Sequence, residues 1–149
     1  MAVLEIRPIE AGDEAEWRRL WTAYLAFYET VLPETMFATT FSRLLSNGGQ
    51  EFHGLLAVRD GHPVGLAHYV FHRSCWHDGY VCYLQDLYAD PDVRGRGVGR
   101  ALIEAVYARA GAAGSPEVYW MTQEFNATAR KLYDRIADKT PFVIYQKTL

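Results

Sequence analysis

The spacing of apolar residues along the chain changes from an alternating pattern to a helical one and back. Residues 3–9 alternate between apolar and polar side chains, which is typical of a strand with one buried face. The next segment places large apolar side chains three or four residues apart, predicting a helix whose side chains mostly enter the core: Trp17, Leu20, Trp21, Tyr24, Leu25 and Tyr28. A shorter helix is predicted over residues 34–46, before the turn-forming residues 47–49.

The pair Asp60-Gly61 separates two strand-like runs and is the strongest short-range hairpin signal in the chain. The remaining pattern predicts a strand over 80–90, a helix over 99–113, a strand over 118–123, a helix over 127–137 capped by Asn126, and a last strand over 142–149. The resulting order is β-α-α-β-β-β-α-β-α-β, an antiparallel meander followed by two alternating α/β units. It indicates the α/β (α+β) class.

Composition excludes several classes of protein without selecting one. The 149 residues, half of them apolar and 22% charged, predict one globular domain over residues 1–149. Without a long apolar run or a signal-peptide pattern, we expect a cytoplasmic protein with no membrane partner. The net charge of −3 argues against a nucleic-acid partner. The only two cysteines, Cys75 and Cys82, are expected to be reduced and buried, and they lack metal-ligand spacing with the histidines.

Residues 94–100 combine three glycines and three arginines directly before a predicted helix. The first turn of a helix has unpaired N–H groups and the positive end of the helix dipole, so it attracts phosphate. Glycines let that backbone approach an anion closely, and arginines add positive charge. The stretch therefore predicts a diphosphate site; the alternative is a tight strand-to-helix connection with a solvated basic surface.

Two common phosphate-binding motifs do not fit these residues. The dinucleotide pattern G-x-G-x-x-G fails because Arg100 stands where its third glycine would be. The nucleotide pattern G-x-x-x-x-G-K-[ST] fails because the chain has no Gly-Lys pair.

The sequence Arg94-Gly95-Arg96-Gly97-Val98-Gly99 resembles the Q/R-x-x-G-x-G/A signature of the GNAT superfamily of acyl-CoA-dependent N-acetyltransferases. The element order is also similar to that fold. The resemblance implies a mixed, mostly antiparallel sheet of six or seven strands with splayed central strands, flanked by about four helices. It also implies acetyl-CoA as the cofactor.

The resemblance assigns cofactor-binding residues on three segments. The strand before the glycine-rich loop would pair with the pantetheine arm, and the loop and helix start would bind the diphosphate through backbone N–H groups. The later segment, residues 126–134, resembles the family pattern N-x-x-A-x-x-[LF]-Y, which implies that Tyr133 lies beside the sulfur. The implied cofactor-binding residues are Leu87, Tyr88, Ala89, Arg94, Gly95, Arg96, Gly97, Val98, Gly99, Arg100, Ala101 and Asn126.

The C-terminal part of the chain resembles the yeast-type group that includes histone, polyamine and D-amino-acid acetyltransferases. The run Leu84-Gln85-Asp86 is similar to Leu-Glu-Asp of the polyamine enzymes, but Gln85 replaces a carboxylate that would hold or deprotonate an amine. A polyamine acceptor is therefore less well supported than the acetyltransferase class. The family's Gly-Phe pair after the last motif helix is also absent.

Acetyl transfer from a thioester to an amine sets the roles that these residues would fill. An alkylammonium has a pKa of about 10.4 and must lose a proton before it attacks. Asp86 is the expected carboxylate for amine binding or proton relay, and Tyr133 the expected acid that protonates the thiolate. A backbone N–H near Leu87 would stabilise the oxyanion. As alternatives, Tyr133 is a core residue, Asp86 is a buried structural carboxylate paired with an arginine, or Cys82 carries the acetyl group.

Four residues are candidates for contact with the acceptor: Tyr28, Glu29, Trp76 and Gln85. Because successive side chains of a strand point to opposite faces, only one of Gln85 and Asp86 should face the acceptor unless a bulge intervenes. The leading hypothesis is an N-acetyltransferase acting on a primary amine, and the alternative is a silent acyl-CoA sensor. A homodimer is expected, formed through the strand predicted over residues 142–149.

Overall fold

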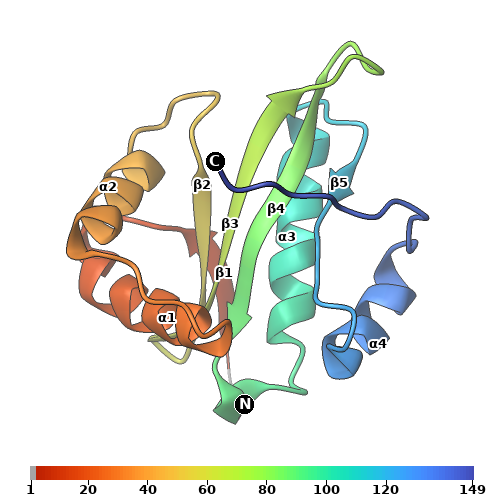
Figure 1. The fold of residues 1–149 in the computed structure, drawn as a ribbon. Coiled ribbons are helices and arrows are strands. Elements are labelled where there is room, and N and C mark those ends of the chain that lie inside the picture. Colours follow the sequence, from red (N-terminus) through yellow and green to blue (C-terminus); the bar gives the residue numbers. More distant parts are fainter. Residues whose placement is uncertain (1–2) are drawn as a thin grey trace.

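A five-stranded mixed sheet forms the centre of the protein (Figure 1). The structure is a computed structural model and describes residues 3–149. The strands lie in the order of the sequence; the first four are antiparallel to their neighbours, and β5 is parallel to β4. Their bounds are β1 Leu4–Pro8, β2 His53–Arg59, β3 His62–Arg73, β4 Tyr80–Ala89 and β5 Val118–Tyr119.

Helices cover both faces of this sheet (Figure 1). Helices α1 (Glu14–Phe27) and α2 (Glu34–Leu45) lie on one face and α3 (Val98–Ala112) on the other, with α4 (Ala127–Ile136) following β5. Two apolar cores result. The α1–α2 core contains Trp17 and Leu20 and the α3 core contains Leu102 and Ile103, and none of these four side chains is exposed to solvent.

Most predicted elements are confirmed, because their signals are local. The Asp60-Gly61 turn joins β2 to β3, and both residues have positive φ values of 49° and 82°, as a two-residue hairpin of this type requires. The four helices agree with the predicted ones, except that α1 starts at Glu14 after a 3-10 turn over Ala11–Asp13.

The expected sheet of six or seven strands is wrong for the described residues. Residues 142–149 form no strand, and β5 has two residues instead of the predicted six. A strand needs a neighbouring edge with which to exchange hydrogen bonds. Among residues 3–149 this segment pairs with no other strand, and its apolar side chains are exposed, Tyr145 by 93%.

None of the helices within residues 3–149 is long and apolar enough to cross a membrane. The cysteine prediction is half right. Both cysteines are free and Cys82 is buried, but Cys75 is exposed in the loop between β3 and β4.

Candidate active site

A narrow pocket opens where β4 and β5 separate. The two strands pair only at Cys82 with Val118 and at Tyr83 with Tyr119. The chain after β5 then moves away from β4, and side chains from α1 and α4 complete the walls. The pocket is lined by Tyr24, Tyr28, Leu84, Gln85, Leu87, Trp120, Met121 and Tyr133. Four predicted site residues, Tyr28, Gln85, Leu87 and Tyr133, therefore meet here.

A β-bulge at Gln85 decides which side chains of β4 face this pocket. His68 on β3 pairs with Asp86, whereas the next residue, Tyr69, pairs with Leu84, so Gln85 is the extra residue. The bulge reverses the alternation, so Leu84 lies in the α3 core while Asp86 bonds to residues of the α1 side. Gln85 lines the pocket, and Asp86 lies behind its wall, 8% exposed.

Asp86 is held by a buried hydrogen-bond network. Its Oδ2 atom lies 2.8 Å from Nδ1 of His68 and accepts a bond from Nε1 of Trp21 at 3.3 Å. On the other side of the imidazole, Trp17 donates its indole N–H to Nε2 of His68 at 2.9 Å. Because an indole nitrogen only donates, Nε2 is an acceptor and the imidazole proton sits on Nδ1. His68 is thus neutral and donates to an ionised Asp86; the predicted alternative of an arginine partner is wrong.

This network also sets the ionisation of Asp86 and its neighbour Tyr24. Burial opposes ionisation of the carboxyl, but hydrogen bonds from His68, Tyr24 and Trp21 hold the pKa of Asp86 below its usual value. Burial, followed by the nearby negative charge of Asp86, raises the pKa of the Tyr24 phenol far above its usual value. At neutral pH the site therefore contains an anionic carboxylate next to a neutral phenol.

Tyr133 reaches the pocket from α4. Its ring packs edge-on against Trp120, with the ring centroids 5.3 Å apart. Burial, with a smaller contribution from Tyr28, raises the pKa of Tyr133 to about 12. The phenol therefore keeps its proton throughout the neutral range and can donate it to a developing thiolate.

The glycine-rich loop lies directly after β4 and a 3-10 turn over Pro91–Val93. Gly95 and Gly97 have positive φ values of 80° and 81°, and a Cβ added at either would meet open space. The first helical bond of α3 runs from Ala101 N–H to Gly97 C=O at 2.9 Å. The N–H groups of the first turn before Ala101 therefore have no carbonyl acceptor within the helix. A loop with unobstructed glycines, followed by unpaired N–H groups at the start of a helix, fits the diphosphate of CoA.

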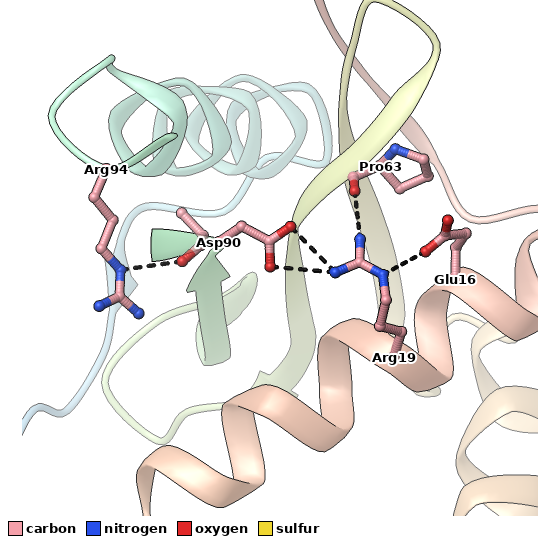
Figure 2. Close-up of polar contacts among 6 residues, drawn as sticks. Glu16, Arg19, Pro63, Asp90 and Arg94 are labelled. Atoms are coloured by element: carbon pink, nitrogen blue, oxygen red, sulfur yellow. Dashed lines mark hydrogen bonds and ion pairs between the residues drawn. The ribbon is translucent and has the colours of Figure 1, made fainter. Parts of the chain in front are cut away.

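Arg19 on α1 ties that helix to the start of the loop (Figure 2). Its Nη1 atom lies 3.2 Å from Oδ2 of Asp90, and its Nη2 donates to the Pro63 carbonyl at 2.8 Å. Its Nε also bonds to Glu16, one turn earlier on the same helix. The end of β4 is therefore fixed against the helix that supplies Tyr24 and Tyr28.

Two of the three loop arginines bond to the protein itself. Arg94 donates its Nε–H to the Ala89 carbonyl at 3.1 Å (Figure 2). Its guanidinium lies 5.8 Å from the centre of the Tyr88 ring. Arg100 pairs with Glu104 at 2.7 Å. Arg94 thus braces the strand that the resemblance assigns to pantetheine.

Comparison with known proteins decides the family. The model of the acetyltransferase (GNAT) family matches residues 17–137, which include the pocket, the glycine-rich loop and α4. The chain belongs to the GNAT acetyltransferase family. It is an N-acetyltransferase, and acetyl-CoA is its cofactor.

Two relatives extend over most of this GNAT protein. The D-amino-acid N-acetyltransferase HPA3 of Saccharomyces cerevisiae is 41% identical over 144 residues, covering 95% of this chain and 89% of the relative. The thialysine N-epsilon-acetyltransferase of Bos taurus is 30% identical over 142 residues, covering 89% and 82%.

Solved structures agree in fold. The aminoglycoside N-acetyltransferase AAC(6')-Iy in complex with CoA superposes with a TM-score of 0.85 at 21% identity, covering 99% of this chain and 96% of that chain. The ribosomal-protein-alanine N-acetyltransferase of Brucella melitensis biovar Abortus 2308 gives a TM-score of 0.81 at 19% identity, covering 99% of each chain.

Three other predicted site residues of this GNAT protein lie outside the pocket lining. Trp76 is 83% exposed in the loop between β3 and β4. Glu29 has a positive φ of 53° and borders a neighbouring groove of about 630 Å³ between α1 and α2. Asn126 precedes α4 but makes no capping hydrogen bond; its Nδ2 instead donates to Oγ1 of Thr122 at 3.4 Å. That groove is larger than the pocket. The pocket is nevertheless the candidate site, because Tyr133 and the bulge of β4 lie there.

Three polar or aromatic side chains in or behind the pocket wall are not among the predicted site residues: Tyr24, His68 and Trp120. Tyr24 has the helical spacing of a core residue. A phenol hydroxyl on the buried face of a helix nevertheless indicates that a polar group lies next to it. His68 lies in the buried apolar middle of β3, where an unbonded imidazole would be costly. Nothing in the local sequence indicates that Trp120 packs on Tyr133.

Proposed function

We propose that the chain transfers an acetyl group from acetyl-CoA to the primary amine of a small molecule bound in the pocket. The observation that carries the proposal is that Tyr133, Tyr28 and Gln85 come from three separate elements and line one pocket. This pocket borders β4 just before the loop that fits a diphosphate. An amine nucleophile, a proton donor and a thioester would therefore meet there.

The cofactor would lie along β4 and end at the loop. Beyond Tyr83, the β4 edge facing β5 has no strand partner among residues 3–149. Those backbone groups of Leu87, Tyr88 and Ala89 that point to this edge would therefore pair with a pantetheine arm, apart from the Ala89 carbonyl, which accepts from Arg94. The amides of Gly95 and of residues 97–100 would hold the diphosphate, helped by the exposed side chain of Arg96. The amides of Arg96 and Ala101, which the resemblance also included, already donate to Val93 and Gly97. When bound, acetyl-CoA supplies an activated acetyl group as a thioester.

One side chain and one backbone amide would then serve the reaction directly. Tyr133 holds a proton that its raised pKa keeps in place until a thiolate develops beside it. The Leu87 N–H would donate to the oxyanion, an interaction typically worth roughly 10²–10³ in rate. Tyr28 and Gln85 would contact the acceptor through neutral polar groups. Cys82 takes no part, because it is fully buried and burial raises the pKa of its thiol to about 12.

Amino acids are the first acceptors to test. The relative that is 41% identical is a D-amino-acid N-acetyltransferase, and Gln85 leaves the pocket without the second carboxylate expected for a polyamine. The carboxylate of Glu29, in the adjoining groove, is placed to attract a second cationic group on a longer acceptor.

An acceptor screen with Tyr133→Phe tests this function. The panel contains D- and L-amino acids, polyamines, aminoglycosides and a lysine peptide, and acetylated product is measured by mass spectrometry. We expect at least one small amine to react, and Tyr133→Phe to lower kcat by roughly 10²–10⁴-fold while acetyl-CoA still raises Tm. Tyr107→Phe, which removes a phenol outside the pocket lining, should retain activity. Acetyl-CoA binding without product from any amine would favour the silent sensor.

We also infer that the exposed C-terminal segment pairs with a second copy of the chain. Residues 142–149 have a strand-like sequence, and four apolar side chains of the segment are at least 65% exposed: Phe142, Val143, Ile144 and Tyr145. Burial of such side chains against a partner is favourable. Sedimentation should give twice the chain mass of 17.0 kDa, and deletion of residues 142–149 should halve it. A full chain that sediments at 17.0 kDa would contradict the dimer.

A further inference from the structure

Trp120 contacts both the helix that carries Tyr133 and the helix α3. It directly follows β5, and its side chain lines the pocket together with Tyr133. The centre of its ring system lies 5.3 Å from that of Tyr133, at an interplanar angle of 68°, and 6.3 Å from that of Tyr107 on α3. Aromatic rings attract one another in such edge-on and offset arrangements. Trp120 thus joins one aromatic ring on α4 to another on α3.

The direction of the Tyr133 side chain has few other constraints. None of the residues of α4 is fully buried, and within residues 3–149 Trp120 is the only aromatic side chain that contacts the Tyr133 ring. In the same part of the chain the Tyr133 hydroxyl makes no hydrogen bond, whereas that of Tyr107 donates to the Ile136 carbonyl at 2.9 Å. A phenol that gives its proton to a thiolate needs such a free hydroxyl. Its direction must therefore be set by packing around the ring.

The helix alone leaves the Tyr133 ring two directions. A long side chain on an α-helix takes a χ1 angle of about 180° or about −60°, because the third rotamer meets the preceding turn. These two rotamers point the hydroxyl in different directions. Contact with the indole favours one of them, since an edge-on aromatic pair shifts such an equilibrium by roughly 2- to 10-fold.

We propose that Trp120 is a positioning residue that holds the Tyr133 hydroxyl at the pocket for proton donation to the thiolate of CoA. This role rests on the proposed function, in which Tyr133 is the acid. Trp120 acts only through Tyr133, so its removal lowers kcat by misplacing the acid. A side chain that merely filled space would instead act independently of the Tyr133 hydroxyl.

A double-mutant cycle separates these two roles, using the fastest acceptor from the amine panel at saturating acetyl-CoA. Trp120→Leu should lower kcat roughly 10- to 100-fold, because a small misplacement of a reacting group is that costly. In a Tyr133→Phe background the same change should lower kcat by no more than about twofold, because no hydroxyl is left to misplace. Trp120→Phe keeps an aromatic ring and should recover most of the kcat.

Tyr119→Leu is the matched control. Tyr119 is the preceding aromatic residue, but its ring stacks on Tyr83 and its hydroxyl lies 2.7 Å from Nε2 of His72, outside the pocket lining. This variant should keep the wild-type kcat. A similar loss here would indicate a general disturbance of β5 and count against the proposal. Equal losses for Trp120→Leu with and without the Tyr133 hydroxyl would mean an independent structural role and overturn it.

A second measurement needs neither cofactor nor activity. In NMR spectra of the free protein, the three-bond Hα–Hβ couplings of Tyr133 report whether χ1 occupies one rotamer. The wild type and Tyr119→Leu should show a single rotamer, and Trp120→Leu should show averaged couplings. Identical couplings in Trp120→Leu and the wild type would mean that the indole does not set the direction of the ring, which would overturn the proposal.

The proposed function and the positioning role fail in different ways. A wild-type chain that acetylates no amine, or a Tyr133→Phe variant with full kcat, would remove the acid role on which positioning rests. A large loss of kcat in Tyr133→Phe together with wild-type kcat in Trp120→Leu would overturn the positioning role alone.

Discussion

Arg19 and Asp90 join the helix that lines the candidate pocket to the first residue after β4. The guanidinium Nη1 lies 3.2 Å from one carboxylate oxygen and 3.4 Å from the other (Figure 2). The Arg19 side chain is half exposed, and that of Asp90 is 19% exposed. The pair therefore connects the two halves of the site at its rim.

Arg19→Ala should loosen the start of the cofactor loop. A partly exposed ion pair is worth about 1 kcal/mol, so we expect KM for acetyl-CoA to rise roughly fivefold with kcat nearly unchanged. Steady-state kinetics with varied acetyl-CoA measure this. Arg18→Ala is the control, because Arg18 pairs with Glu14 and Glu34 on the same face of the fold but not with the loop. Equal effects of both variants on KM would contradict the assignment.

Gly97→Ala should weaken acetyl-CoA binding through backbone strain. Its φ of 81° is left-handed, which costs an alanine about 1–2 kcal/mol, and the loop would relieve that strain by moving its amides. We expect KM for acetyl-CoA to rise about tenfold. Gly61→Ala carries a matched strain, with a φ of 82° and open space, but in the hairpin turn. It should lower Tm similarly and leave KM unchanged; a rise in KM for both would contradict the prediction.

Buried phenols should make the protein lose stability at alkaline pH. Burial raises the pKa of Tyr133 from 10.0 to about 12, so the folded state keeps a proton that the unfolded state releases. This contribution is fully present below pH 10 and is lost as the pH rises to 12, by up to about 3 kcal/mol. Urea unfolding at pH 9, 10 and 11 should show a shallower decline for Tyr133→Phe. Parallel declines would count against a buried, neutral phenol.

Alkylation should distinguish the two thiols and test the absence of an acyl-cysteine step. Cys75 is exposed, whereas Cys82 is buried and burial raises the pKa of its thiol to about 12. Iodoacetamide at pH 8 should add one group to the native protein, at Cys75, with acetyl transfer retained. Mass spectrometry should show the second group only after denaturation. Rapid modification of Cys82 with loss of activity would instead support a covalent role.

The parts of the site that the sequence predicts are those set by neighbouring residues. A glycine-rich loop, a helix start after it and a tyrosine on the last helix all follow from short-range spacing. Tyr28, Gln85 and Tyr133 could be proposed from the family resemblance, and they lie in one pocket.

The rest depends on contacts between distant residues. Trp17 and His68 are 51 positions apart, and Trp21 and Asp86 are 65 apart, so no local pattern joins them. The strand predicted over residues 142–149 is wrong, because a strand-like sequence does not supply the neighbouring edge with which a strand must pair. Alternation along the strand did not decide which of Gln85 and Asp86 faces the pocket, because a bulge does not show in the sequence pattern.

The bulge at Gln85 has a consequence for how this protein can acquire new acceptors. Gln85 has no partner residue in the β3–β4 register, so its side chain is free of the constraints that fix its neighbours. Substitutions at this position alter the wall of the pocket while leaving Leu84 in its core and Asp86 in its network. Acceptor preference can thus evolve at Gln85 with little loss of stability. Insertion or deletion of one residue there would instead exchange the faces of the strand.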